Sequence, residues 1–121
     1  MATVIVLANT SLNEADKKRF VEEIGTAVTE SLQLPPHLKS ITLQEFPRSN
    51  STPKDYEEIT FFVYTAPGKP VEAKRALVRN IQLTAERVLA GVNVKTIVII
   101  KEHGDENVGV GGQLRLDQVQ A

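Results

Sequence analysis

The chain has 121 residues and a mass of 13.3 kDa, and 41% of its residues are hydrophobic, which is enough for one domain with one core. Its 14 basic and 15 acidic side chains leave a formal net charge of -1, so no excess of positive charge attracts nucleic acid or an anionic membrane. The absence of cysteine excludes disulfides, thiolate metal sites and a cysteine nucleophile.

The longest apolar run near the start covers residues 4–8. It is too short to cross a bilayer or to form the core of a signal peptide, and no basic residue precedes it. We therefore expect a cytoplasmic protein that binds neither a membrane nor nucleic acid.

The first half of the chain predicts a strand, a helix and a second strand. Residues 3–8 are continuously apolar and largely β-branched, which is typical of a strand buried on both faces. Apolar side chains at three- and four-residue steps predict a helix over residues 13–34, with Ser11 or Asn13 as its cap and a proline pair as its stop. Alternating residues over 40–46 predict the second strand.

The second half predicts the same order of elements after a connector. Residues 47–58 are polar and rich in turn formers. An apolar strand over 59–64 is followed by a helix that begins near Pro70 and stops at Gly91, and by a strand over 96–100. The glycines of residues 108–112 indicate a tight hairpin.

The two halves are one pattern written twice. A single register without gaps superimposes seven identical pairs: Thr3 on Thr60, Val6 on Val63, Lys17 on Lys74, Val21 on Val78, Ile24 on Ile81, Leu32 on Leu89 and Glu45 on Glu102. We predict a single α/β (α+β) domain made of two fused βαβ repeats, about 1–46 and 59–121. A helix between two strands makes those strands parallel, so both helices cover one face of a four-stranded sheet. A ferredoxin-like regulatory module, which has the same element order, is the alternative fold.

The second face of this sheet predicts an oligomer. The strands are apolar on both sides, and one chain has no further element to cover the second side. We expect another copy of the chain to cover it.

Both halves resemble the βαβ unit of the tautomerase superfamily, whose longer members are fused pairs that form trimers, and the second half matches best. The residues that carry the resemblance are the strand 59–64, Gly68-Lys69 before the helix, Lys74, the strand end Ile99-Ile100-Lys101-Glu102, and Val108-Gly109-Val110-Gly111-Gly112-Gln113-Leu114. The last stretch is similar to the family's F-G-I-G-G-E-L hairpin. The resemblance covers nearly all of the chain outside the connector, and it implies a homotrimer.

The resemblance also implies a site built on an N-terminal amine. Family members use an N-terminal proline, exposed by methionine removal, to move a proton on a carbonyl-containing acid. Here that place is taken by Ala2, or by Met1 if the methionine is kept. Either offers a primary amine with an ordinary pKa of about 7.7–8.0, which burial beside a cation lowers toward neutrality.

The remaining site residues depart from the family's set. Of the places where the family has arginines, Leu12, Ser40 and Ile97 are uncharged and only Lys69 keeps a charge. Lysine binds a carboxylate as a point charge and lacks the two-pronged geometry of arginine.

Three further positions complete the candidate substrate-binding set. Arg48 in the connector and Arg115 after the hairpin are additional carboxylate anchors, and Val108 replaces the family's hairpin aromatic. His103, Asp105 and Glu106 form a polar turn that we interpret as a solvated loop, with no metal and no cofactor.

These residues favour at most a weak keto–enol tautomerase acting on a small carboxylated carbonyl compound. The N-terminal amine would be the base and Lys69 the carboxylate anchor. The alternative is a non-catalytic oligomeric member that binds a small molecule or a protein and has lost the catalytic proline and arginines.

Overall fold

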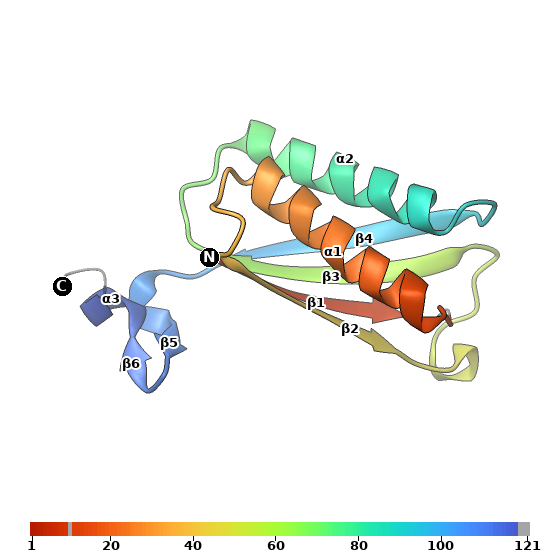
Figure 1. Ribbon diagram of the computed structural model, residues 1–121, viewed down its shortest axis with the longest axis horizontal. Coiled ribbons are helices and arrows are strands. Elements are labelled where there is room, and N and C mark those ends of the chain that lie inside the picture. Colours follow the sequence, from red (N-terminus) through yellow and green to blue (C-terminus); the bar gives the residue numbers. More distant parts are fainter. Residues whose placement is uncertain (10, 119–121) are drawn as a thin grey trace.

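The computed structural model describes residues 1–9 and 11–118. Four strands form one sheet, with two long helices above it (Figure 1). The main elements follow in the order β1 (Ala2–Ala8), α1 (Glu14–Ser31), β2 (Lys39–Glu45), β3 (Glu57–Thr65), α2 (Val71–Val88) and β4 (Val94–Glu102). One turn of 3-10 helix, η1 (Arg48–Asn50), lies in the connector.

The strand pairing confirms two fused βαβ units. The sheet order is β2-β1-β3-β4, with β1 parallel to β2 and β3 parallel to β4. The units join where β1 runs antiparallel to β3. In a ferredoxin-like module, a strand of the other unit separates the two strands of each βαβ unit, so this order excludes that alternative.

Local side-chain chemistry explains where the long helices begin and end. Asn13 caps α1, because its Oδ1 accepts a hydrogen bond from the backbone N–H of Asp16 at 2.8 Å. The helix ends earlier than expected, at Ser31, because the chain already leaves it at Gln33 with a φ of 56°. Pro70 lies at the cap of α2 and not in its first turn, and Gly91, with a φ of 84°, follows its end.

The core lies between the sheet and the helices. Alternate side chains of β1 and β3 point into it, and Val4, Val6, Phe61 and Val63 are 0% exposed. The rings of Phe20 and Phe61 meet there with centroids 6.2 Å apart. The intervening side chains point away from the helices, so in a single subunit the strands are buried on one face only.

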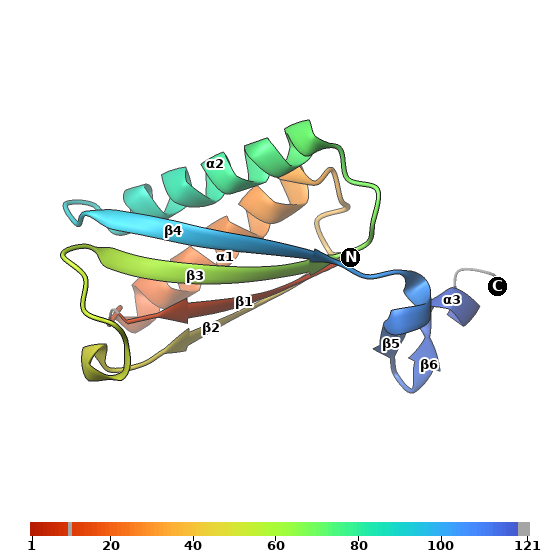
Figure 2. The same cartoon turned by 180° about the vertical axis from the view of Figure 1, so that it is seen from behind.

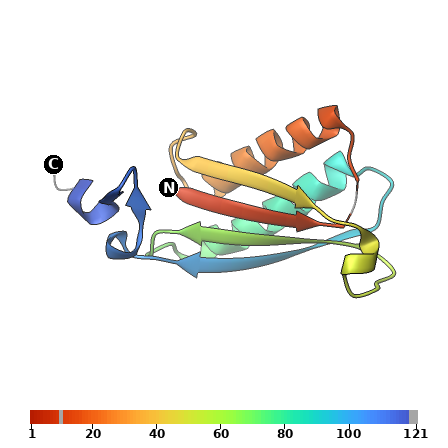
Figure 3. The same cartoon turned by 90° about the horizontal axis from the view of Figure 1, so that it is seen from below.

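The open face of the sheet is apolar in its central row. Ile5 pairs with Phe62, and Phe62 pairs with Ile99, so these three side chains form a row across β1, β3 and β4. Ile5 is 38%, Ile97 42% and Ile99 40% exposed. Figure 3 views the sheet from this side, which no helix covers. Residues 3–8 were expected to be apolar on both faces with nothing in the same chain to cover the second, and within one chain this face is indeed uncovered.

Residues 103–118 form a C-terminal arm that extends beyond the sheet (Figures 1 and 2). It contains η2 (Asp105–Asn107), β5 (Gly109–Val110), β6 (Gln113–Leu114) and the short α3 (Arg115–Gln118). The expected hairpin is present, and its turn needs glycine because Gly111 and Gly112 have φ values of 62° and 87°. Val110, Leu114 and Leu116 are exposed on the arm.

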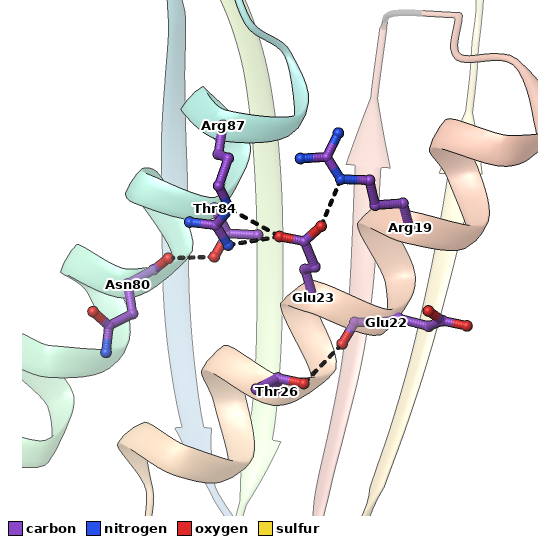
Figure 4. Close-up of polar contacts among 7 residues, drawn as sticks. All are labelled: Arg19, Glu22, Glu23, Thr26, Asn80, Thr84 and Arg87. Atoms are coloured by element: carbon purple, nitrogen blue, oxygen red, sulfur yellow. Dashed lines mark hydrogen bonds and ion pairs between the residues drawn. The ribbon is translucent and has the colours of Figure 1, made fainter.

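A pair of arginines joins the two helices through Glu23 (Figure 4). Arg87 of α2 donates to Glu23 Oε1 from Nε at 2.9 Å and from Nη2 at 2.7 Å, and Arg19 of α1 donates to Oε2 at 2.6 Å. The hydrogen bonds from Arg87, and then those from Arg19, hold the pKa of Glu23 below its ordinary value.

Among the described residues, no helix is long and apolar enough to cross a membrane.

We predict that Glu23→Gln lowers the free energy of unfolding by about 1 kcal/mol at pH 7, because a charge-assisted contact between the helices is lost. A carboxylate with a lowered pKa stabilises the fold above its unfolded pKa of about 4.3, and this contribution disappears as pH falls through the folded pKa. Urea denaturation of both proteins from pH 7 to pH 3 should therefore show the difference shrinking with acid.

The control is Glu22→Gln on the same helix, since the Glu22 side chain is exposed and points away from Arg87 (Figure 4). An equal loss in the two variants at pH 7 would contradict a specific role for Glu23.

Candidate functional site

One cavity of about 260 Å³ lies at the edge of the sheet where the arm begins. The antiparallel pairing places Ala2, at the start of β1, opposite Thr65, at the end of β3. Thr65 in turn pairs with Glu102, after which β4 leads into the arm. The cavity is lined by the first residues of the chain, the end of β3 and the arm: Met1, Thr3, Tyr64, Thr65, Ala66, His103, Asp105, Val108 and Arg115.

Backbone and hydroxyl contacts hold Met1 at this edge. The N–H of Ala2 donates to the carbonyl of Leu38 at 3.0 Å, and the buried Thr65 hydroxyl donates to the carbonyl of Met1 at 3.3 Å. The N–H of His103 donates to the carbonyl of Thr65 at 2.8 Å, which ties the root of the arm to β3. The first residue is thus fixed between two strands.

The α-amino group of Met1 has a lowered pKa. Partial burial is the largest cause, because it disfavours the charged ammonium, and the positive charges of Arg115 and Lys69 lower the pKa further. The carboxylate of Asp105 acts in the opposite direction. Lys69, which does not line the cavity, is therefore close enough for its charge to act on the amine.

The predicted anion site at the start of α2 is already occupied by a side chain. Glu102 Oε2 lies 3.5 Å from the backbone nitrogen of Lys69, and its Oε1 lies 3.2 Å from Lys74 Nζ. The hydrogen bond from Lys74 is the main reason why the pKa of Glu102 is lowered. A ligand at this edge would thus meet the charge of the Lys69 side chain but would have to compete with Glu102 for the backbone N–H.

The first unit repeats this arrangement. Glu45 Oε2 accepts from the N–H of Leu12 at 2.8 Å, and Glu45 Oε1 lies 3.0 Å from Lys17 Nζ. Lys17 and Glu45 are the partners, by the repeat, of Lys74 and Glu102. Because the same ion pair closes the same helix start in both units, we assign it a structural role.

An aromatic pair forms one wall of the cavity. The rings of Tyr64 and His103 are stacked, with centroids 5.7 Å apart and planes 20° from parallel. His103 and Asp105 were expected in a solvated loop, whereas the structure places both in the cavity wall. No cluster of three or more histidine, aspartate or glutamate side chains suited to a metal occurs in residues 1–9 and 11–118.

The expected pairing of the two parallel strands could have identified the residues that were missed. The ends of two parallel strands meet at one edge of a sheet, so the residues at the end of 59–64 and those just after 96–100 must lie together. Tyr64, Thr65, His103 and Asp105 follow from that rule, but Tyr64 and Thr65 were not candidates, and His103 and Asp105 were interpreted as a solvated loop.

The candidate residues separate into two groups. Met1, Val108 and Arg115 line the cavity, and Lys69 lies near it. Arg48 lies in η1, beyond the opposite end of the sheet, where its guanidinium is ion-paired with Glu57. Within one subunit Arg48 is therefore not part of this cavity.

Comparison with solved structures places this architecture among known folds. The R7 fused 4-OT wild-type asymmetric trimer matches with a TM-score of 0.79 and 21% identity over 97% of this chain and 98% of that one. Pt0534 inactivated by 2-oxo-3-pentynoate matches with a TM-score of 0.81 and 21% identity over 96% and 98%. Malonate semialdehyde decarboxylase matches with a TM-score of 0.81 and 15% identity over 98% of both chains.

The chain has the tautomerase-superfamily fold. This confirms the predicted fold, with its two fused βαβ units. Neither a known sequence family nor a curated protein matches the sequence. At these identities the comparison shows the fold alone.

We predict opposite effects on the amine pKa from two neighbours of Met1. Arg115→Ala should raise the pKa of the α-amine, because a positive charge that lowers it is removed. Asp105→Asn should lower this pKa further, because the charge that raises it is removed. The pH dependence of N-terminal acylation by a neutral reagent, followed by mass spectrometry, measures both.

Arg79→Ala is the matched control, since Arg79 is an exposed arginine on α2. Shifts of the same sign in Arg115→Ala and Asp105→Asn would refute this account of the charges around the amine.

Proposed function

We propose that the cavity at the sheet edge binds a small carboxylated carbonyl compound and catalyses weak keto–enol tautomerisation. The observation that carries the proposal is that a partly buried α-amine of lowered pKa shares this cavity with Arg115. A neutral amine accepts a proton, and a guanidinium binds a carboxylate through two parallel hydrogen bonds. The two functions that the reaction needs thus lie together.

The proposed roles follow from this geometry. The N-terminal amine, of Ala2 after methionine removal or of Met1, removes a proton from the enol and returns it to the neighbouring carbon. Arg115 anchors the substrate carboxylate, with Lys69 adding positive charge. Val108, Tyr64 and His103 form the apolar and aromatic walls. No group beyond these side chains and the amine is required.

Assembly as a homotrimer is the second part of the proposal. The row Ile5, Phe62 and Ile99 on the open face, together with the exposed apolar side chains of the arm, supports burial against other subunits. The similar R7 and F6 fused 4-OT structures are described as asymmetric trimers and the Q0 structure as a symmetric one. The cytoplasmic location expected from the sequence stays a prediction.

A non-catalytic binding protein is the second candidate function. The observation that favours it is that the chain has only a primary amine, and no proline, at the start of β1. In that case the cavity still binds a carboxylated ligand through Arg115, but no proton is transferred.

The enzymatic proposal predicts accelerated ketonisation of phenylenolpyruvate, followed by ultraviolet absorbance. Arg115→Ala should raise KM about tenfold or more, because a charge-assisted contact with the carboxylate is worth about 1.5–3 kcal/mol. Lys69→Ala should raise KM less, since Lys69 lies outside the cavity wall. Arg79→Ala should leave both kcat and KM unchanged.

An N-terminal extension of two residues separates the two candidate functions, because it displaces the amine without removing Arg115. Loss of turnover with retained ligand binding supports the tautomerase. Equal rates in the parent, the extended form and Arg115→Ala would leave the binding protein as the better account.

For the assembly, we predict that Ile99→Asp shifts the protein from trimer to monomer, because a charge replaces an exposed apolar side chain in the proposed interface. Sedimentation equilibrium measures the mass. Val71→Asp is the control, since Val71 is 59% exposed at the start of α2 on the helix side of the sheet. A parent protein that sediments as a monomer would contradict the homotrimer.

A further inference from the structure

The N-terminal amine at the cavity can act as a nucleophile as well as a base. An α-amine that begins at Met1 or at Ala2 is primary in either case, so it carries two hydrogens when neutral. A neutral primary amine attacks a carbonyl carbon and, after loss of water, forms an uncharged imine. Methionine removal therefore changes the position of this group, but the group remains a primary amine. This inference rests on the proposed function, since it concerns the same cavity and the same amine.

The surroundings of the amine favour its nucleophilic form. Partial burial, followed by the charges of Arg115 and Lys69, lowers its pKa, so a larger fraction is neutral near pH 7 than for an ordinary chain terminus. The contacts of Ala2 with Leu38 and of Met1 with Thr65 hold this segment against the sheet. The neutral fraction of the amine is thus raised and its segment is held in place, which are the two requirements of an amine that forms imines.

The position of Arg115 selects the ligand. Arg115 and Met1 line the same cavity of about 260 Å³, so a carboxylate on the guanidinium lies in the cavity that the N-terminal residue also lines. In a 2-oxo acid the carbonyl carbon is bonded directly to the carboxylate carbon. A compact acid of this kind can therefore present its carbonyl to the amine while its carboxylate stays on Arg115.

We propose that the N-terminal amine captures small 2-oxo acids as a reversible covalent imine. The nitrogen forms a bond to the C2 carbon and gives a carbinolamine, whose hydroxyl group leaves as water with one proton taken from the nitrogen. The C2–O bond breaks and a C2–N double bond remains. Hydrolysis by water reverses the reaction and restores the free acid, so no oxidant, reductant or cofactor takes part.

Two measurements on the full chain test the capture. Pyruvate with sodium cyanoborohydride at pH 7 reduces any imine to a stable amine, and peptide mapping by mass spectrometry locates it. Pyruvate in ¹⁸O-labelled water reports the same step without a trap, because each cycle of capture and hydrolysis replaces the C2 oxygen by one from solvent. Because an amine that only moves protons can also accelerate this exchange by catalysing hydration of the carbonyl group, the exchange supports the imine only together with the N-terminal adduct.

The expected adduct is a single pyruvate-derived group on the N-terminal peptide, with protein-dependent oxygen exchange. Arg115→Ala should slow both about tenfold, since it removes the carboxylate anchor and raises the amine pKa. The two-residue N-terminal extension should reduce labelling to the rate of the urea-unfolded chain. Arg79→Ala should behave like the parent, and circular dichroism checks that each variant is folded.

The results separate this inference from the proposed function. Ketonisation of phenylenolpyruvate without an N-terminal adduct overturns the imine and leaves the tautomerase in place. An N-terminal adduct with oxygen exchange but no ketonisation supports the imine and removes the tautomerase. Labelling of Lys69 or of other lysines in preference to the terminus, or an equal rate in the extended form, overturns the imine.

Discussion

The antiparallel pairing of β1 with β3 is the constraint on which the rest of the structure depends. It joins the two βαβ units into one sheet and places both helices on the same side. The same pairing brings the first residue of the chain beside the end of β3, and the parallel partner β4 delivers the arm to that point. Every residue that lines the cavity belongs to the start of the chain, to the end of β3 or to the arm that follows β4.

The two units share an ion pair at the start of the helix but differ in the first residue of the unit and in the contacts between the helices. The pairs Lys17–Glu45 and Lys74–Glu102 close equivalent helix starts, so this contact belongs to the repeated framework. At the position equivalent to Ala2, the second unit has Ile59, which is enclosed by peptide bonds on both sides and has no amine. The repeat is also broken at the contact between the helices, because the position of α2 that corresponds to Glu23 of α1 is Asn80.

Much of the framework could be predicted from the sequence, because hydrophobic period and turn chemistry are local signals. The repeat register, the strand and helix positions and the glycine hairpin followed from them. Helix ends were less accurate, since no residue type announces that Gln33 adopts a positive φ. For residues 3–8 the element count predicted that one chain leaves the second face uncovered, whereas an apolar run alone does not say what covers that face.

The site was only partly predictable, for a physical reason. Arg115 and Val108 were identified because the hairpin motif marks them, and both line the cavity. Tyr64, His103 and Asp105 are separated in sequence and meet only through strand pairing, so no local pattern singles them out. Arg48 was an inference from charge alone, and its proximity to Glu57 shows that charge without topology does not locate a side chain.

The C-terminal arm has a consequence for how ligand and assembly communicate. The same short segment carries Arg115 and Asp105, which set the charge around the amine, and Val110, Leu114 and Leu116, which are exposed away from any core of its own subunit. Whatever surface receives those apolar side chains fixes the position of the two charged ones. Any effect of a ligand in the cavity on docking of the arm would then be matched by an equal effect of docking on the affinity for that ligand.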